Sequence, residues 1–245
     1  MFNESDYQFY DDSYRFVTPN WLSFENQNVI DSFLEKNNET MIDFIDDFSG
    51  KFDLQKNSFL ECGCGLGGLS IKLSSSFTDC YGVDVSNLAI MGANRICELK
   101  NISNSQFQVG DLTKEINLKK QFDLIADSHL LHCLTDSSHR QNYFDFIKKH
   151  LSKSGYFLVE CMTFQKNIDF PMEYELTDSS DIIHQGKKIR RLLTTHELEQ
   201  EFLSAGFKIN YLFYHDELAF DLFTDYKHYP HEKLPKTTRV GLSLN

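Results

Sequence analysis

The sequence has 245 residues, which fits one large domain, or one domain with a cap, that buries its core without disulfides or metals. A hydrophobic share of 41% and an aromatic share of 14% exclude an intrinsically disordered chain. The net charge of −12, from 24 basic and 36 acidic residues, argues against a protein that binds nucleic acid through a broad basic face.

Residues 1–50 are polar and aromatic, with helical spacing in two places. One apolar run includes Trp21, Phe24 and Phe33, and a second begins at Met41 and stops before Gly50. We interpret residues 1–50 as an N-terminal helical cap or lid that precedes the core.

From residue 57 onward, short apolar strands alternate with helical patterns. Strands are predicted at 58–61, 79–84, 105–109, 122–126 and 156–161, and helices at 69–77, 87–100 and 139–151. This alternation predicts an α/β fold with a parallel sheet and helices on both faces.

The alternation stops at residues 163–188, a long segment that contains Pro171 and few helix signals. Long loops in compact domains are usually functional, so we expect a substrate-side insertion here. A dense basic patch lies at its end, and we interpret it as a solvated strand edge. The patch consists of Lys187, Lys188, Arg190 and Arg191.

After this insertion the pattern predicts a helix at 197–205 with a capped start, followed by closing strands at 207–214 and 217–223. We therefore place the core domain at 51–225. The remaining residues, 226–245, read as a polar C-terminal tail.

The cysteines are scattered and lack the two-residue spacing of zinc or thioredoxin motifs. They are Cys62, Cys64, Cys80, Cys97, Cys133 and Cys161. We expect reduced thiols in a cytoplasmic protein. The acidic, aromatic N-terminus does not resemble a signal peptide, and no apolar run approaches the roughly 18 residues of a membrane span.

A glycine-rich segment joins the first predicted strand to the following helix, with glycines at Gly63, Gly65 and Gly67. Glycines at this position let the backbone turn tightly and approach a ligand closely. The spacing of Gly63, Gly65 and Gly68 also satisfies the dinucleotide fingerprint, so the glycines alone leave a NAD-dependent oxidoreductase open.

Carboxylates end the next two predicted strands. Asp84 is placed to accept hydrogen bonds from both hydroxyls of a ribose, and Asp111 lies where an adenine edge would meet its carboxylate or the next amide. Because the carboxyl ends of neighbouring strands form the ligand crevice of open α/β sheets, the sequence predicts a nucleotide-like cofactor there.

With these motifs in order, residues 57–223 resemble the class I S-adenosylmethionine (SAM)-dependent methyltransferases. The first motif matches 60–67, the second 83–86, the adenine-side motif 110–112, and the fourth strand 122–127. The resemblance implies a Rossmann-like, seven-stranded, mostly parallel sheet with helices on both faces and an antiparallel C-terminal strand. It also implies SAM as the cofactor.

The same resemblance assigns cofactor-binding roles to individual residues. Glu61 would pair with the SAM ammonium group, which would distinguish this loop from a pyrophosphate-binding one, and Asp84 would hold the ribose. Asp127 follows the fourth strand and would lie near the methyl group. The full expected set is Glu61, Gly63, Cys64, Gly65, Gly67, Asp84, Val85, Asp111, Leu112 and Asp127.

Methyl transfer requires alignment of the acceptor, and a base only where the acceptor must lose a proton. The candidates for a base are His129 and His132, which follow the fourth strand and share a face if the turn is helical. Two alternatives remain open: a pair of structural histidines, or a metal site that adds Cys133 and His139. We predict no metal.

Aromatic side chains are the candidates for acceptor binding, because aromatic faces attract sulfonium and amine groups. Tyr10, Tyr14 and Trp21 lie in the predicted lid, and Phe164 opens the insertion. Simple packing of the lid onto the core is the alternative. We expect a small-molecule partner and neither nucleic acid nor membrane, and the sequence leaves the oligomeric state undetermined.

Methylation of a small molecule at N, O or C is thus the leading hypothesis. Alternatives are non-methyl SAM chemistry on the same fold, such as cyclisation or aminocarboxypropyl transfer, a NAD-dependent oxidoreductase, and a non-catalytic SAM-binding protein. Protein methylation also stays open.

Overall fold

The computed structural model describes residues 27–36, 38–165, 174–219 and 234–245. The strands of its main sheet are β1 (Ser58–Cys62), β2 (Asp79–Asp84), β3 (Ser105–Val109), β4 (Phe122–Ser128), β5 (Leu151–Thr163), β9 (Phe207–Ala219) and β10 (Lys236–Leu244). The helices are α3 (Gln27–Lys36), α4 (Glu39–Ser49), α5 (Gly68–Leu73), α6 (Asn87–Lys100), α7 (Ser137–His150) and α8 (Thr195–Ser204), with a 3₁₀ turn, η1 (Leu131–Cys133).

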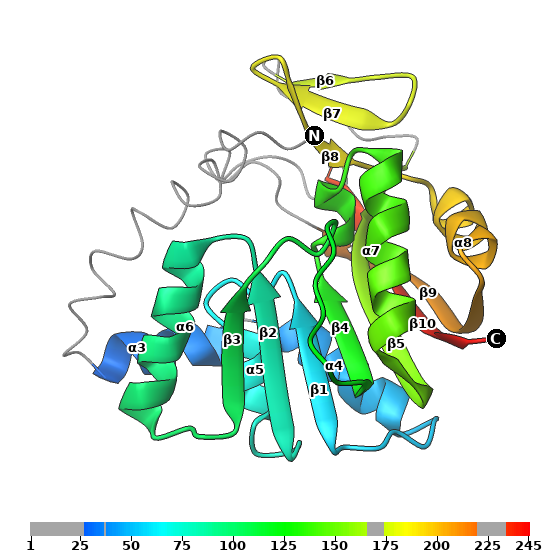
Figure 1. Ribbon diagram of the computed structural model, residues 1–245. Coiled ribbons are helices and arrows are strands. Elements are labelled where there is room, and N and C mark those ends of the chain that lie inside the picture. The colour runs from blue at the N-terminus through cyan, green and yellow to red at the C-terminus, as the bar shows by residue number, and fades with distance from the viewer. Residues whose placement is uncertain (1–26, 37, 166–173, 220–233) are drawn as a thin grey trace.

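The seven strands follow the order β3-β2-β1-β4-β5-β10-β9. The first five pair in parallel, whereas β10 runs antiparallel to both β5 and β9. Helices cover both faces of the sheet (Figure 1). The expected Rossmann-like sheet with an antiparallel C-terminal strand is confirmed.

Hydrophobic layers fill the space between the sheet and its helices. On one face, α7 and α8 bring Phe144, Ile147 and Phe202 against the sheet residues Phe157 and Val159, and all five side chains are buried. On the other face, α4 and α5 supply a second layer. Burial of such side chains drives the sheet and helices together, at roughly 1.5–3 kcal/mol for each large apolar group.

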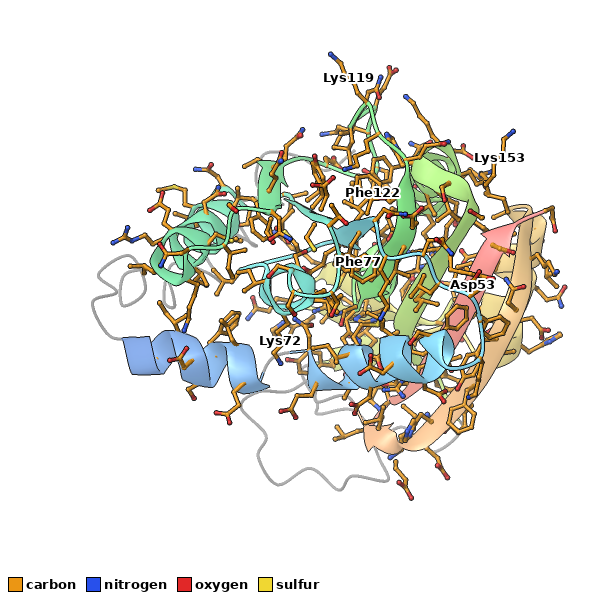
Figure 2. The ribbon with its side chains drawn as sticks, turned by 90° about the horizontal axis from the view of Figure 1, so that it is seen from below. Asp53, Lys72, Phe77, Lys119, Phe122 and Lys153 are labelled. Atoms are coloured by element: carbon orange, nitrogen blue, oxygen red, sulfur yellow. The ribbon has the colours of Figure 1, made fainter. Side chains whose placement is uncertain are left out.

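Figure 2 shows the same division between interior and surface. Phe77 and Phe122 lie in the interior and are buried, whereas Lys119 and Lys153 point outward into solvent.

Helix α4, from the segment predicted as a cap, belongs to the core. Its apolar residues recur at helical spacing, which gives the helix one apolar face. That face lies on the sheet residues Leu124 and Leu158. The buried residues of α4 are Met41, Phe44, Ile45 and Phe48.

The C-terminal segment corrects the sequence analysis. Residues 226–245 were expected to form a tail, but Lys236–Leu244 forms β10, inserted between β5 and β9. The strands expected at 207–214 and 217–223 are continuous as β9 up to residue 219, and residues 220–223 lie outside the described residues. The side chains of Thr237, Thr238 and Arg239 are buried there despite their polarity. Their partners lie far earlier in the chain, so the local sequence does not reveal the strand.

The expected insertion at 163–188 contains a small antiparallel sheet of β6 (Tyr174–Leu176), β7 (Asp181–His184) and β8 (Lys187–Arg191). Gln185 and Gly186 both have positive φ, at 51° and 74°, which is typical of a two-residue hairpin turn. Figure 1 shows this small sheet, in yellow, above the carboxyl ends of the parallel strands.

Candidate active site

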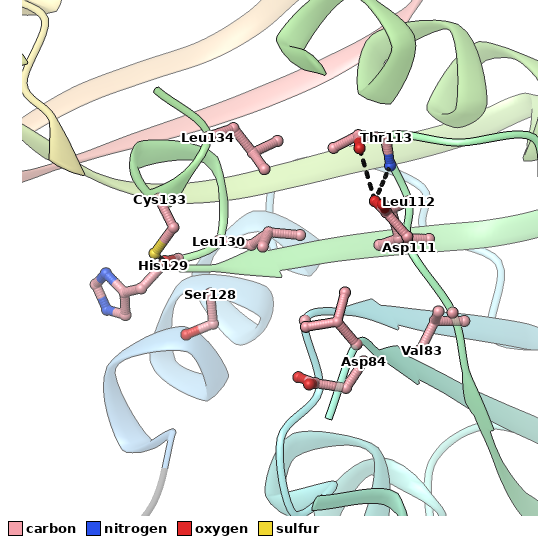
Figure 3. A pocket seen from close by; sticks show the side chains of 13 residues that line it. Val83, Asp84, Asp111, Leu112, Thr113, Ser128, His129, Leu130, Cys133 and Leu134 are labelled. Carbon is pink, nitrogen blue, oxygen red and sulfur yellow. Dashed lines mark hydrogen bonds between the residues drawn. The ribbon is translucent and has the colours of Figure 1, made fainter. Parts of the chain in front are cut away.

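A pocket of about 190 Å³ lies at the carboxyl ends of β1, β2, β3 and β4. It joins residues from the connections that follow these four parallel strands, as expected for a sheet of this topology. The lining residues are Gly63, Val83, Asp84, Val85, Gly110, Asp111, Leu112, Thr113, Ser128, His129, Leu130, Cys133 and Leu134. Figure 3 shows His129 and Cys133 at one end and Asp111 and Thr113 at the other.

Two glycines of the loop have backbone conformations that other residues disfavour, and neither position has room for a Cβ atom. Gly63 and Gly67 have φ values of 66° and 74°, in the left-handed region that side chains disfavour. A Cβ on Gly63 would lie 3.1 Å from the Leu130 side chain, and one on Gly67 would lie 2.5 Å from the Phe107 ring. Gly63 alone of the expected loop residues lines the pocket; Cys64, Gly65 and Gly67 shape the loop behind it.

Asp84 ends β2 and lies in the pocket beside this loop. One carboxylate oxygen accepts the backbone N–H of Gly65 at 2.8 Å, and the other accepts that of Ser86 at 2.8 Å. A carboxylate carries two acceptor oxygens, and Asp84 is among the residues that line the pocket. The loop therefore fixes a half-buried carboxylate that is suited to a pair of neighbouring hydroxyl groups.

The next connection forms the wall at the Asp111 end of the pocket. The Asp111 carboxylate accepts the N–H and the hydroxyl of Thr113, at 2.9 and 2.6 Å, and pairs with Lys114 at 3.1 Å. These bonds orient Asp111 within its own turn. Val85 and Leu112 line the same region with apolar surface, which suits a flat aromatic base.

At the opposite end of the pocket, the backbone of His129 is in the left-handed region, with φ of 74°. Its backbone N–H donates to the backbone carbonyl of Glu160 at 3.1 Å. Burial, and then the positive charge of Arg190, lower the pKa of His129 to about 4. The imidazole is therefore neutral at physiological pH. Cys133 lies beside it, with its thiol donating to the His129 carbonyl at 3.3 Å.

A buried ion pair supports His129 from behind. Arg239 on β10 donates from Nε to Glu160 Oε1 at 2.8 Å, and the Thr40 hydroxyl donates to Glu160 Oε2 at 3.0 Å. The same Oε2 lies 3.8 Å from Nε2 of His129. Burial raises the pKa of Glu160, while Arg239 and Thr40 act to lower it. Contacts from β10 and α4 thus hold the Glu160 carboxylate, on β5, close to the imidazole of His129.

The structure places Glu61 outside the residues that line the pocket, and the ammonium-binding role that the resemblance implies stays a prediction. Its Oε2 accepts both the backbone N–H and the hydroxyl of Ser70, at 2.8 and 2.7 Å, beneath the glycine loop. The side chain is buried, and burial raises its pKa to about 7. Glu61 therefore holds the start of α5 in place.

Replacing Glu61 by glutamine tests this structural role. Because the folded state raises the pKa from 4.5 to about 7, the stability that Glu61 contributes is full below pH 4.5 and is lost as the pH rises to 7. We expect the unfolding free energy of Glu61→Gln, taken relative to that of wild type, to be higher at pH 7 than at pH 5 by about 2 kcal/mol, because glutamine does not titrate. Urea titrations at both pH values measure this difference. Affinity for S-adenosylhomocysteine should stay within about threefold, whereas a loss of 100-fold would restore the ammonium-binding role.

Two further predicted residues are buried outside the pocket lining. Asp127 accepts the backbone N–H groups of Leu130 and Leu131 and the hydroxyl of Tyr143, the last at 2.8 Å, and burial raises its pKa to about 6. His132 accepts the N–H of Met162 at 3.2 Å, and burial holds its pKa well below the usual value. Both residues fix the turn that presents His129.

Of the expected acceptor-binding aromatics, Phe164 lies among the described residues, and it is not part of the pocket lining. Phe164 packs against the buried Met162, Ile182 and Leu192, and Tyr10, Tyr14 and Trp21 lie outside the described residues. Within the described ranges, no three His, Cys, Asp or Glu side chains cluster as metal ligands would. In the same part of the chain, no helix is both long and apolar enough to cross a membrane.

Thr113, Ser128 and Leu134 in the lining, and the pair of Glu160 and Arg239 behind it, were not predicted as site residues from the sequence. Glu160 had a usable signal, because an acidic residue inside an otherwise apolar strand needs a partner when it is buried. Arg239 had no such signal, since its strand was not recognised.

These residues fit SAM. The glycine loop leaves room where a Cβ would clash, Asp84 offers acceptors for ribose hydroxyls, and Val85 and Leu112 form an apolar surface for adenine. Gly63, Asp84, Val85, Asp111 and Leu112 are the predicted cofactor residues that the pocket brings together.

Comparison with known proteins agrees with this fit. The chain is similar to a SAM-dependent methyltransferase from Clostridium acetobutylicum (18% identity, 83% of this chain and 90% of that one, TM-score 0.63). It is also similar to the glycopeptide N-methyltransferase MtfA complexed with SAM (15%, 82% and 92%, TM-score 0.55) and to the [4+2]-cyclase SpnF (14%, 82% and 80%, TM-score 0.61).

No curated protein gives a significant match. The model of the family described as "Methyltransferase domain" matches residues 33–212, which cover every strand that lines the pocket. The cofactor is S-adenosylmethionine, as this match and the SAM-complexed structure of MtfA support. The chain belongs to the methyltransferase domain family.

Proposed function

We propose that this protein methylates a small-molecule acceptor at N, O or C, with His129 accepting a proton where the acceptor must lose one. The observation that carries the proposal is the continuity of the pocket. One cavity contains Asp84 and Asp111, which suit the nucleoside part of the cofactor, and also His129 and Cys133 at the other end.

SAM supplies a methyl group on a positively charged sulfur, ready for in-line displacement by a nucleophile. The chain's own residues hold and orient the reactants, which is the main contribution that such a reaction requires. Gly63 lets the backbone approach the cofactor, Asp84 holds the ribose, and Val85 and Leu112 enclose the base. Leu130 and Leu134 add apolar lining that limits access of water.

His129 has the position and protonation state of a proton acceptor. It lines the pocket, and its pKa of about 4 leaves the ring uncharged at neutral pH. The carboxylate of Glu160, 3.8 Å from Nε2, would stabilise the imidazolium that forms when the ring takes up a proton. Arg239 and Thr40 hold that carboxylate in place.

Charge and size support a small-molecule partner. The net charge of −12 disfavours nucleic acid as the acceptor, and a pocket of about 190 Å³ suits small groups. We propose a cytoplasmic enzyme that binds neither nucleic acid nor membrane. The similarity to a glycopeptide N-methyltransferase leaves larger acceptors to be tested in the same assay.

Non-methyl chemistry is the second candidate, because a [4+2]-cyclase has the same fold. Product analysis of the enzyme incubated with SAM and an acceptor library separates the two. S-adenosylhomocysteine together with a methylated product supports the proposal. Methylthioadenosine, or an acceptor rearranged with SAM intact, would contradict it.

Replacing His129 by asparagine tests its role while keeping a residue that tolerates the left-handed backbone. We expect turnover to fall by about 100-fold or more, since a positioned base contributes at least that much. Wild-type turnover should fall as the pH drops through about 4, because only the neutral ring accepts a proton.

The measurements are steady-state rates and affinity for S-adenosylhomocysteine, which should stay within about threefold in His129→Asn. His196→Asn, at an exposed position on α8, is the matched control and should retain wild-type rates. Unchanged turnover in His129→Asn would remove His129 from the mechanism.

A further inference from the structure

The hairpin of β7 and β8 carries four cations, and two of them have a clear structural role. Lys188 Nζ and Arg191 Nε lie 2.6 and 2.8 Å from the carboxylate of Asp181, which is fully buried. Lys187 is exposed at the turn. The expected solvated edge therefore describes only part of this basic patch, and Arg190 needs a separate explanation.

Arg190 is half-buried and incompletely satisfied. Its Nη1 donates to the carbonyl of Ile189 at 2.7 Å, but its Nε is shielded from solvent without a hydrogen-bond partner among the described residues. Among the described residues, Arg190 also forms no ion pair with a carboxylate. Leaving a buried donor without a partner is costly, so the guanidinium is suited to a group that the described residues do not supply.

The position of Arg190 indicates where that group would lie. Strand β8 packs against η1, the turn that carries Cys133, and Cys133 and His129 line the pocket. The charge of Arg190 acts on this segment, since after burial it is the next contribution that lowers the pKa of both His129 and His132. Strand β8, which carries Arg190, thus lies beside the segment that forms the wall of the pocket opposite Asp111.

We propose that Arg190 recognises an oxyanion, a carboxylate or phosphate, carried by the methyl acceptor. This inference rests on the proposed function and narrows its substrate class. A guanidinium presents donors in a planar fork that matches such groups. Because the chain is acidic overall, an anionic acceptor needs one local cation of this kind near the reacting end of the pocket.

Nuclear magnetic resonance of the protein saturated with S-adenosylhomocysteine tests the proposal. The readouts are the Arg190 Nε–H signal, assigned by its absence in Arg190→Gln, and the backbone amide of Cys133. The probes are benzoate, its neutral counterpart benzamide, and inorganic phosphate. We expect benzoate or phosphate to shift both signals saturably, with affinity at least about tenfold above that of benzamide, as a charge-assisted bond provides.

Three variants isolate the role of Arg190. In Arg190→Gln the Cys133 shift should lose its preference for the anions, and Arg190→Lys, which keeps the charge, should retain part of it. Lys187→Gln removes the same charge from an exposed position on the hairpin and should behave as wild type.

The possible failures are distinguishable. If S-adenosylhomocysteine does not bind the wild-type protein, the proposed function fails and this inference with it. If it binds but neither anion shifts the signals up to its solubility limit, or benzamide binds equally well, only the role of Arg190 is overturned. An anion preference that persists in Arg190→Gln has the same consequence.

Discussion

Replacing Asp84 by asparagine should weaken the binding of S-adenosylhomocysteine by about 100-fold. The two carboxylate oxygens accept the N–H groups of Gly65 and Ser86, and the side chain lines the pocket. Asparagine replaces one oxygen with a donor, so one ribose hydroxyl loses its acceptor and one backbone N–H meets another donor. Isothermal titration calorimetry measures the loss directly.

Asp79→Asn is the matched control, because Asp79 is the first residue of the same strand and pairs with Lys120 at the amino end of that strand, away from the pocket. It removes the same charge, and its affinity should stay within about twofold of wild type, as for a surface pair. Equal affinities in Asp79→Asn and Asp84→Asn would contradict the assignment of Asp84 to the cofactor.

Replacing Glu160 by alanine should lower the free energy of unfolding by about 3–5 kcal/mol, because it leaves the Arg239 guanidinium buried without its counter-charge. Glu160 is fully buried and Arg239 nearly so, and the hydroxyl of Thr40 loses its acceptor in the same variant. Urea unfolding, followed by circular dichroism, measures the change.

Glu98→Ala provides the comparison, since Glu98 forms an exposed pair with Arg95 on α6. Exposed pairs contribute about 0–1 kcal/mol, so this variant should unfold almost as wild type does. A loss in Glu160→Ala no larger than that in Glu98→Ala would show that the ion pair does not hold β5, β10 and α4 together.

The sequence predicts the parallel half of the fold because the signals there are local. Each strand from β1 to β4 is short and has glycine or aspartate at its carboxyl end or directly after it, so Gly63, Asp84 and Asp111 could be placed at one edge of the sheet. The capping box of Thr194 and Glu197 likewise marks the start of α8 within four residues.

The rest depends on contacts between distant segments. Strand β10 is rich in polar residues and becomes a buried strand only through pairing with β5 and β9. The role of Glu61 depends on whether its carboxylate turns toward the ligand or toward Ser70, and the strand pattern is the same in both cases. The pair of Gln185 and Gly186 was a local turn signal that the sequence analysis did not use.

Titration calorimetry of the wild-type protein with S-adenosylhomocysteine and, separately, with NAD tests the central claim most directly. The pocket of Gly63, Asp84 and Leu112 predicts saturable binding of one S-adenosylhomocysteine per chain and no binding of NAD. Saturable binding of NAD, with none of S-adenosylhomocysteine, would contradict it.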